Sequence, residues 1–191
     1  MPLAAYPLKD DLNLYTYVGN DPLDKTDPSG AAVEVAYGDG TSPADFQEMR
    51  TYLEGSPAFN AQYQVLVKSD NIYTVQLGTS DRFEYNESSR TISINPHSAL
   101  EFSNGDIQSP AIGFAHEVDH AARHEGEPKQ FAKDRAVTQK TTDEGVEVSR
   151  NGADEAKAIK FEQRVAGDLH ERGRTSYAEL VKTKPVLLTV S

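Results

Sequence analysis

Apolar and polar residues alternate along three short stretches of the chain, and a period of two is typical of strands with one buried face. The stretches are 32–37, 72–77 and 90–94. All three are rich in Val, Ile, Thr and Tyr, which favour extended backbone. A polar segment, 78–89, separates the second stretch from the third. We therefore predict three strands, the last two joined by a long polar connection.

A helical period of apolar residues marks the chain between the first two predicted strands. Thr41-Ser42-Pro43 starts a helix, because a hydroxyl at the N-cap and Pro in the first turn favour initiation. Gly55-Ser-Pro57 ends it soon after Leu53. The next segment, 58–68, fits both a helical and a strand pattern, and we interpret it as a helix.

Two longer helices are predicted in the second half of the chain. Ser109 and Pro110 start the first, which then carries the apolar residues Ile112 and Phe114 and should be half buried. The second runs over 151–169, with a buried side marked by Ala158, Ile159, Ala166 and Leu169. The polar stretch 125–150 is interpreted as a mobile loop that covers a substrate-binding cleft. The expected fold is α+β, with a small twisted sheet packed on the first of these helices.

The first long helix contains His116-Glu117-Val118-Asp119-His120, which has the form H-E-x-x-H. Positions i and i+4 lie on the same face of a helix, so the two imidazoles can bind one metal ion. The Glu117 carboxylate stands beside them and can act as general base on a water that the metal acidifies. The pattern predicts a zinc hydrolase site in which His116 and His120 bind Zn²⁺. A solvated helix with two unrelated His residues is the competing interpretation.

Catalytic zinc needs a third protein ligand. The longer pattern H-E-x-x-H-x-x-G-x-x-H fails, because Arg123 replaces its Gly and Gly126 replaces its last His. His124 lies four residues after His120, but three His residues in a row along one helix do not close around a single ion. We interpret His124 as a surface residue.

The second long helix offers carboxylates instead. Glu155 and Glu162 are seven residues apart on its apolar side. A buried carboxylate without a partner is costly, and a metal ion would be that partner. We predict Glu155 as the third ligand, with Glu162 as the alternative. Ion pairs with Lys157 or Arg164 are the competing interpretation.

Charge and residue types restrict the classes of function. The formal net charge is −11 and no basic stripe is present, which argues against a nucleic-acid partner. The chain has no Cys, which excludes disulfides and thiolate zinc sites. No apolar run is long enough for membrane insertion, and the first residues lack the apolar core of a signal peptide. A specialised secretion system would have to carry the protein out of its cell.

The predicted strand before the H-E-x-x-H helix is a candidate for substrate binding. Thr91, Ile92, Ser93 and Ile94 could form a sheet edge to which an extended substrate adds as a further strand. An ordinary core strand is the competing interpretation, and the pattern does not decide between the two.

Residues 1–30 differ in character from the rest, with Asn13-Leu-Tyr-Thr-Tyr-Val-Gly-Asn-Asp-Pro22 followed by Asp27-Pro-Ser-Gly30. This segment closely resembles the end of the Rhs (YD-repeat) core, N-L-Y-x-Y-V-x-N-x-P and then D-P-x-G. In that family the segment closes a large β-cage, and a variable C-terminal toxin follows. The resemblance implies that 1–30 is the end of an Rhs core and 31–191 a toxin domain, with the core shell as a partner. Ala31 stands where the family usually has Leu, so self-cleavage at the junction stays open.

The segment Asp154-Glu-Ala-Lys-Ala-Ile-Lys-Phe-Glu-Gln163 resembles the E-E-x-R-A-x-x-x-E-N segment of the NleD-type zinc proteases. Ile92-Ser-Ile-Asn-Pro96 is similar to the strand that precedes their zinc helix. The resemblance supports a zincin-like domain of the gluzincin type, in which the second helix supplies the Glu155 ligand. It also implies that Asp154 is an acid supporting the ligands, a role also expected of Glu162 if it is not the ligand.

Arg174 and Tyr177 lie just after the second long helix, in Arg172-Gly-Arg-Thr-Ser-Tyr177. The R-x-x-Y spacing resembles that of the clostridial neurotoxin proteases, where Arg and Tyr stabilise the oxyanion. We therefore predict Arg174 and Tyr177 as oxyanion donors. A loop Arg and a packed Tyr are the alternative.

The expected function is that of a zinc metalloendopeptidase acting as the C-terminal toxin of an Rhs effector. The resemblance implies secretion and delivery into the cytoplasm of a target cell, a protein substrate there, and a cognate immunity protein. Two other classes stay open. One is a non-enzymatic binding module in which zinc is absent or structural, in a site closed by His97, His124 or His170. The other is a zinc amidase that acts on peptidoglycan.

Overall fold

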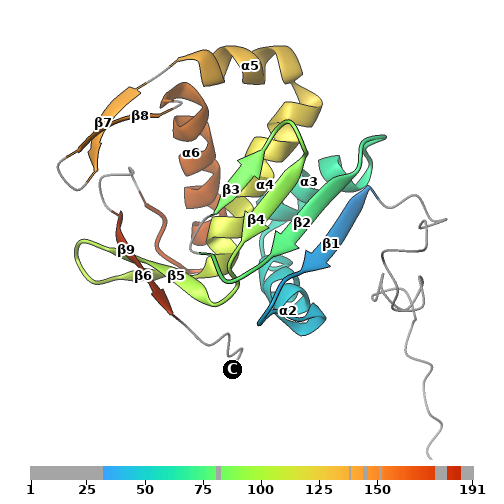
Figure 1. Ribbon diagram of the computed structural model, residues 1–191, viewed down its shortest axis with the longest axis horizontal. Coiled ribbons are helices and arrows are strands. Elements are labelled where there is room, and N and C mark those ends of the chain that lie inside the picture. The colour runs from blue at the N-terminus through green and yellow to red at the C-terminus, as the bar shows by residue number, and fades with distance from the viewer. Residues whose placement is uncertain are drawn as a thin grey trace, which may run out of the picture. The chain divides into compact units, whose positions relative to one another are not determined.

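The three predicted strands lie together in one sheet, called sheet A, in the computed structural model of the protein (Figure 1). The structure describes residues 32–80, 83–137, 139–143, 146–150, 152–174 and 180–185, with side chains at 32–80, 83–137 and 152–174. Sheet A has the order β1-β2-β4-β3. Its strands are β1 (Val33–Tyr37), β2 (Tyr73–Leu77), β3 (Glu84–Asn86) and β4 (Thr91–Ile94). The strands β1, β2 and β4 run parallel, and β3 runs antiparallel to β4 at one edge.

One face of sheet A is buried against helices, as the alternation predicts. On β2, the side chains of Tyr73, Val75 and Leu77 are fully buried, whereas Thr74 and Gln76 are only half-buried. The buried face shares one hydrophobic core with α2 (Pro43–Leu53), α3 (Pro57–Val67) and the helix α4 (Pro110–Gly126). Figure 1 shows these helices on the same side of the sheet.

The Ser-Pro signals place the starts of α2 and α3. In α2 the Ser42 backbone N–H donates to Asp45 Oδ2 at 2.6 Å, and in α3 Ser56 Oγ accepts from the Phe59 N–H at 3.1 Å. Both bonds satisfy groups that a helix end leaves without a partner. The interpretation of 58–68 as a helix is confirmed by α3.

The central helix is α4, in which every residue from Pro110 to Ala122 is buried. It packs between α3 and α6 (Gly152–Asp168). Phe114 joins an aromatic cluster, with ring centroids 6.1 Å from Phe46, 6.0 Å from Phe59 and 6.5 Å from Tyr63. Because Phe114 is two residues before His116, this cluster fixes the start of the H-E-x-x-H motif on the core.

A second sheet, sheet B, has the order β6-β5-β9 and is antiparallel. It consists of β5 (Ser98–Phe102), β6 (Ile107–Gln108) and β9 (Leu180–Pro185). A separate hairpin is formed by β7 (Gln139–Asp143) and β8 (Val146–Arg150). None of these five strands was predicted, because their sequences are short, polar or without clear alternation.

The prediction of a loop over 125–150 is wrong. This stretch contains the end of α4, the helix α5 (Pro128–Ala136), β7 and β8. The buried residues of α5 are Phe131 and Asp134, so the helix has no apolar stripe that its sequence could reveal. Phe131 stacks on His124 with ring centroids 5.1 Å apart, and Asp134 pairs with Lys157 of α6.

The expectation that Thr91, Ile92, Ser93 and Ile94 form a sheet edge is also wrong. The strand β4 pairs with β2 on one side and with β3 on the other, and Ile92 and Ile94 are buried. The competing interpretation, a core strand, is right. The edge strand beside β4 is β3, which was hidden in the polar segment 78–89 because Tyr85 is its buried residue while Glu84 and Asn86 are exposed.

The expected end of the Rhs core, residues 1–30, lies outside the described residues. The domain boundary after residue 30 therefore stays a prediction. Among the described helices, none combines the length and the apolar character that crossing a bilayer requires.

Candidate metal centre

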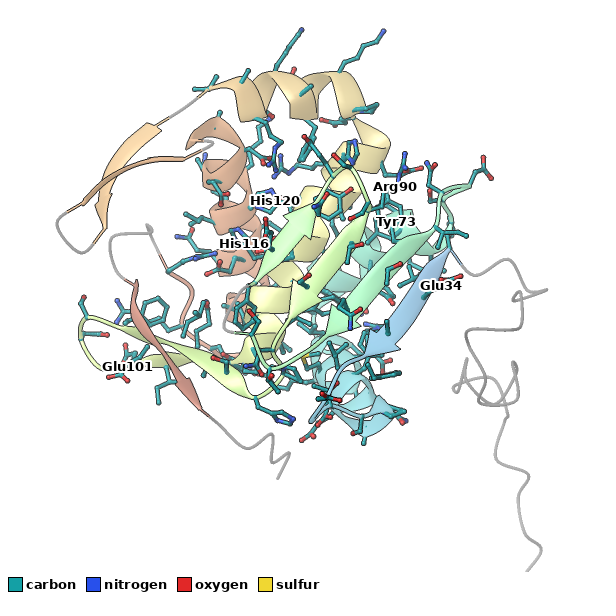
Figure 2. All side chains as sticks on the ribbon, in the orientation of Figure 1. Glu34, Tyr73, Arg90, Glu101, His116 and His120 are labelled. Atoms are coloured by element: carbon teal, nitrogen blue, oxygen red, sulfur yellow. The ribbon has the colours of Figure 1, made fainter. Side chains whose placement is uncertain are left out.

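His116 and His120 lie one turn apart on α4, at its contact with α6 (Figure 2). They are 1% and 3% exposed. Their rings are 4.8 Å apart between centroids, and their Nε2 atoms approach to 3.1 Å. The i, i+4 spacing therefore brings the two imidazole nitrogens to one point, as the motif predicts.

Glu155, on the first turn of α6, reaches the same point. Its Oε2 lies 3.2 Å from His116 Nε2 and 3.6 Å from His120 Nε2. Because α6 packs along α4, the predicted carboxylate faces the two imidazoles across the helix contact. The structure thus brings together the three residues that were predicted as ligands.

The spacing of these three atoms fits a single tetrahedral metal ion. Ligand atoms about 2.0–2.1 Å from tetrahedral zinc are about 3.3 Å from one another. The observed separations of 3.1, 3.2 and 3.6 Å are close to that value. The group could therefore hold a metal ion, and two imidazoles with one carboxylate are a ligand set of catalytic zinc sites.

The charges around the centre also favour a cation. Among the described residues, five carboxylates gather here, those of Glu117, Asp119, Asp154, Glu155 and Glu162. Three guanidinium groups pair with members of this set, those of Arg123, Arg135 and Arg174. The carboxylates of this set therefore outnumber its guanidinium groups when both imidazoles are neutral, and one of those groups, Arg135, also pairs with Glu87. A divalent cation offsets this excess of negative charge, which would otherwise be costly in a buried place.

A carboxylate of α6 supports His116 from behind. Glu162 Oε2 lies 2.9 Å from His116 Nδ1, and Glu162 is fully buried. An ionised carboxylate only accepts, so Nδ1 carries the proton and the Nε2 lone pair is left for a metal. Arg174 Nη2 lies 2.7 Å from the same Nδ1, which would require the opposite tautomer. We assign the proton to Nδ1, because Arg174 is already satisfied by its Nε bond of 2.6 Å to Glu162 Oε2.

A second carboxylate supports His120 in the same way. Asp154 Oδ2 lies 3.0 Å from His120 Nδ1, and Asp154 is fully buried. The imidazoles of His116 and His120 are therefore each backed by an acid from α6, and each of these acids contacts an Arg side chain. Such partners fix the tautomer and the orientation of a ligating imidazole. The predicted supporting roles of Asp154 and Glu162 agree with these contacts.

These contacts change the protonation of the metal-free centre. Burial by itself lowers the pKa of His120, but hydrogen bonds to Asp154 and Glu155 and the charge of Glu117 outweigh it and raise the pKa to about 10. Burial would raise the pKa of Glu155, but its bonds to the two imidazoles hold it well below the usual range. Without a metal, His120 is therefore a cation at neutral pH. Metal binding then releases its proton.

Glu117 is the one acid of the centre that is left without a hydrogen-bond partner among the described residues. It is 6% exposed, and its charge is close enough to His120 to affect the pKa of that imidazole. A carboxylate held beside the ligands and bonded to no protein group is available to a proton of water or substrate. This is the position expected of a general base.

The start of α4 is held by Glu171, three residues after the end of α6. Glu171 accepts from the Ser109 backbone N–H at 2.9 Å, from Ser109 Oγ at 2.6 Å and from the Tyr52 hydroxyl at 2.6 Å. Gln108, the residue before Ser109, donates to Glu162 Oε1 at 2.8 Å. The two helices that supply the ligands are thus joined at this end by polar bonds as well as by packing.

Arg174, one of the two predicted oxyanion donors, has its described bonds behind His116. Arg174 is 4% exposed, and its described bonds run to Glu162 and to His116 Nδ1, the nitrogen that faces away from the ligand group. These contacts place Arg174 behind His116 and argue for a supporting role. Tyr177 lies outside the described residues.

The other His residues belong to separate contacts. His124 is half-buried, and its Nδ1 lies 2.7 Å from the Tyr85 hydroxyl. His97 Nε2 lies 3.4 Å from Asp45. In the part of the chain that the structure describes, the one group able to hold a metal consists of His116, His120 and Glu155. None of His97, His124 and His170 belongs to it.

Sequence reasoning missed Arg123 and Gln108. From the sequence, Arg123 was considered only as the residue that replaces Gly in the pattern H-E-x-x-H-x-x-G-x-x-H, yet Arg123 contacts Asp119 and Asp154. Its position three residues after His120 put it on the same side of the helix, and that was the available signal. The bonds of Gln108 join residues far apart in the chain, and no local pattern reports them.

The fold and this site together define a mixed α+β protein with a candidate metal centre between two helices. No protein-family model, no curated protein and no solved structure matches the chain.

Proposed function

We propose that this protein is a zinc-dependent endopeptidase with a zincin-like domain. One observation carries the proposal: His116 Nε2, His120 Nε2 and a Glu155 oxygen converge beside Glu117, which has no hydrogen-bond partner in the described part of the chain. Three protein ligands leave one position of a tetrahedral ion for water or substrate, whereas a structural site is closed by a fourth. A buried ligand group next to a general base is the arrangement that hydrolysis requires.

The arrangement of the elements supports the zincin-like interpretation. The helix α4, with the H-E-x-x-H motif, packs on sheet A, and α6 supplies the carboxylate ligand. The antiparallel edge strand β3 lies against α4, the helix that carries both His ligands. A small sheet, a motif helix and a second helix with Glu are the parts expected from the sequence.

The residues have separate roles in the proposed reaction. His116, His120 and Glu155 would hold zinc, which supplies Lewis acidity for activating water and polarising a peptide carbonyl. Glu117 takes the proton of the attacking water and then gives it to the leaving amine nitrogen. Glu162 and Asp154 keep the imidazoles oriented throughout.

We assign substrate binding to β3 in place of Thr91–Ile94. The strand β4 uses both of its edges in sheet A, whereas β3 is paired on one side alone among the described strands. An extended peptide can add to such an edge by backbone hydrogen bonds. Tyr85 anchors β3, because its side chain is buried and its hydroxyl bonds to His124 of α4.

The biological setting follows from the resemblance of residues 13–30 to the end of an Rhs core. We propose that the domain is the toxin of such an effector, secreted and delivered into the cytoplasm of a target cell. It would cleave a protein there. A cognate immunity protein would protect the producing cell.

Glu117→Gln tests the catalytic proposal. The variant should retain zinc and lose peptide hydrolysis by at least about 100-fold, because the general base is gone while the ligands remain. New N-termini in intoxicated cells are mapped by proteomics for the wild type and the variant. Glu34→Gln is the control, since it makes the same chemical change at an exposed residue of β1 (Figure 2).

Each outcome points to one class. Cleaved proteins with the wild type and with Glu34→Gln, but not with Glu117→Gln, support the endopeptidase. If the protein kills cells only when it is expressed in the periplasm, and no new protein N-termini appear, the endopeptidase proposal is replaced by a peptidoglycan amidase. If Glu117→Gln is as toxic as the wild type, the endopeptidase proposal is replaced by a non-enzymatic binding module.

A further inference from the structure

The first turn of α6, with Asp154 and the ligand Glu155, meets α4 through the side chain of Arg123. Arg123 Nη2 donates to the Asp154 backbone carbonyl at 3.2 Å. Arg123 Nη1 forms an ion pair of 2.5 Å with Asp154 Oδ1, although the angle is poor for a hydrogen bond. One guanidinium therefore grips both the backbone and the side chain of the residue next to Glu155.

The same guanidinium acts on the support of His120. Asp154 Oδ2 is the acceptor for His120 Nδ1, and Arg123 Nη2 lies 3.3 Å from that nitrogen. A displacement of Arg123 would therefore affect two ligands together: Glu155 through its neighbour in the chain, and His120 through the Asp154 carboxylate. The contacts of Arg123 lie on the side of His120 away from Nε2.

Arg123 is itself held in place from several helices. Its Nε donates to Asp119 Oδ2 at 2.6 Å, and Asp119 Oδ1 accepts from Gln62 of α3 at 2.9 Å. The Phe131 ring of α5 lies 5.7 Å from the guanidinium carbon. The side chain is 13% exposed, so these bonds form where water competes little.

The contact set suits Arg and no other residue. A guanidinium has five N–H donors in a fixed planar fork, so it can bind Asp119 on one side and two groups of Asp154 on the other. A Lys ammonium in this place keeps the charge but lacks the fork. A Met side chain keeps most of the length and loses every bond.

We propose that Arg123 is a positioning residue of the metal centre. It sets the first turn of α6 against α4 and so places Glu155 opposite His116 and His120. The inference rests on the proposed function, because it assumes that these three residues bind zinc.

A merely structural role for Arg123 predicts a different result. If Arg123 only joins α4 to α6, its loss lowers the stability of the metal-free protein and leaves the zinc affinity of the folded protein unchanged. If Arg123 positions Glu155, zinc affinity falls even where the protein is fully folded. Zinc affinity and metal-free stability are therefore measured separately on the full chain.

The first experiment compares the wild type, Arg123→Met and Arg123→Lys by zinc competition with a chelator. We expect zinc affinity to fall by about 10- to 100-fold in Arg123→Met, the range that supporting residues of metal sites show. Arg123→Lys retains a positive charge between Asp119 and Asp154 and so remains folded, yet should still lose about tenfold. The absorption spectrum of the Co²⁺ forms should change in both variants, because ligand geometry changes.

Arg50→Met is the matched control. Arg50 is also a half-buried Arg with its guanidinium over aromatic rings, 4.3 Å from the Tyr63 centroid, but it lies on α2. Its loss should lower stability and leave zinc affinity and the Co²⁺ spectrum unchanged.

A double-mutant cycle with Asp154→Asn tests whether Arg123 acts on the ligands through Asp154. If Arg123 acts through Asp154, the losses of zinc affinity in Arg123→Met and Asp154→Asn are less than additive. Fully additive losses would overturn this route.

The possible failures are distinguishable. If the wild-type chain binds no zinc, the proposed function and this inference are both wrong. A wild type that binds zinc, with equal affinity in folded Arg123→Met and Arg123→Lys, overturns the positioning role of Arg123 alone.

Discussion

Gly173 lies so close to Gln163 that a Cβ atom on Gly173 would stand 2.8 Å from the Gln163 Cα atom. The two segments are joined by a hydrogen bond of 2.8 Å from Gln163 Nε2 to the Arg174 carbonyl. Arg174 then turns its guanidinium onto Glu162, which supports His116. The close approach of the backbones at Gly173 and Gln163 thus fixes the position from which the Arg174 side chain reaches Glu162.

Gly173→Ala should therefore destabilise the protein and weaken zinc binding. The new methyl group meets backbone, which must shift, and strain of this kind costs about 1–3 kcal/mol. The measurement is denaturant unfolding together with zinc affinity. Gly167→Ala is the control, because its Cβ meets nothing within 4 Å and a helical Gly replaced by Ala gains up to about 1 kcal/mol. Equal stability and equal zinc affinity in the two variants contradict the prediction.

Arg174→Met distinguishes support of His116 from oxyanion stabilisation. If Arg174 supports His116, its replacement should lower zinc affinity about tenfold or more, and saturating zinc should restore much of the activity. An oxyanion donor should instead leave zinc affinity unchanged and lower kcat by about 100- to 1000-fold. We expect the first pattern, because the bonds of Arg174 described here lie behind His116. Unchanged affinity with a large loss of kcat at saturating zinc would restore the original prediction for Arg174.

Removal of zinc should lower the melting temperature. The ligands belong to two helices, so a bound ion stabilises the folded state alone, by about 4 kcal/mol when free zinc exceeds Kd 1000-fold. Thermal unfolding with zinc and with a chelator measures this difference. Glu155→Ala should show little difference between the two conditions, whereas Glu117→Gln should retain the shift of the wild type. A shift that persists in Glu155→Ala places the ion elsewhere.

Glu125 should make stability depend on pH in the acid range. Its carboxylate accepts from Ser69 Oγ at 2.6 Å, from Asn71 Nδ2 at 3.0 Å and from the Tyr73 hydroxyl at 2.6 Å. Partial burial works against ionisation, but these bonds prevail and hold its pKa below the usual 4.5. The contribution is thus complete above pH 4.5 and is lost as pH falls through the lower, folded-state pKa.

Glu125→Gln measures this contribution. The variant should be less stable than the wild type by about 1 kcal/mol at pH 7, after allowance for solvent screening, and the difference should shrink in acid. Glu34→Gln, at an exposed acid of β1, is the control and should show no such trend. A difference between wild type and Glu125→Gln that stays constant down to acid pH would contradict this assignment.

The local parts of this structure could be predicted from the sequence. Alternation gave β1, β2 and β4, because each has one face on the core, and the Ser-Pro starts gave α2 and α4. The helix α3 was predicted from an apolar pattern that also fitted a strand. The approach of the His116 and His120 imidazoles to one point followed from helical spacing. Glu155 was found because an acid on an apolar helix face needs a partner.

The parts that depend on distant pairing could not be predicted in this way. Whether β4 is an edge or a central strand depends on β3, whose sequence shows one buried residue, Tyr85. The position of Arg174 depends on the path of the chain after α6, which brings it behind His116. Arg123 lies on the motif helix, but its role depends on the packing of α6 against α4.

Sheet B has a consequence for how the protein matures. Its strand β9 pairs with β5 from Ser98↔Pro185 to Phe102↔Leu180, so the last described strand completes a sheet begun far earlier in the chain. Synthesis proceeds from the N-terminus, and domains fold as their segments emerge. Arg174 stands only a few residues before β9. A nascent chain that has not yet reached residue 174 thus already contains the three candidate ligands, but it lacks the guanidinium that holds Glu162 behind His116.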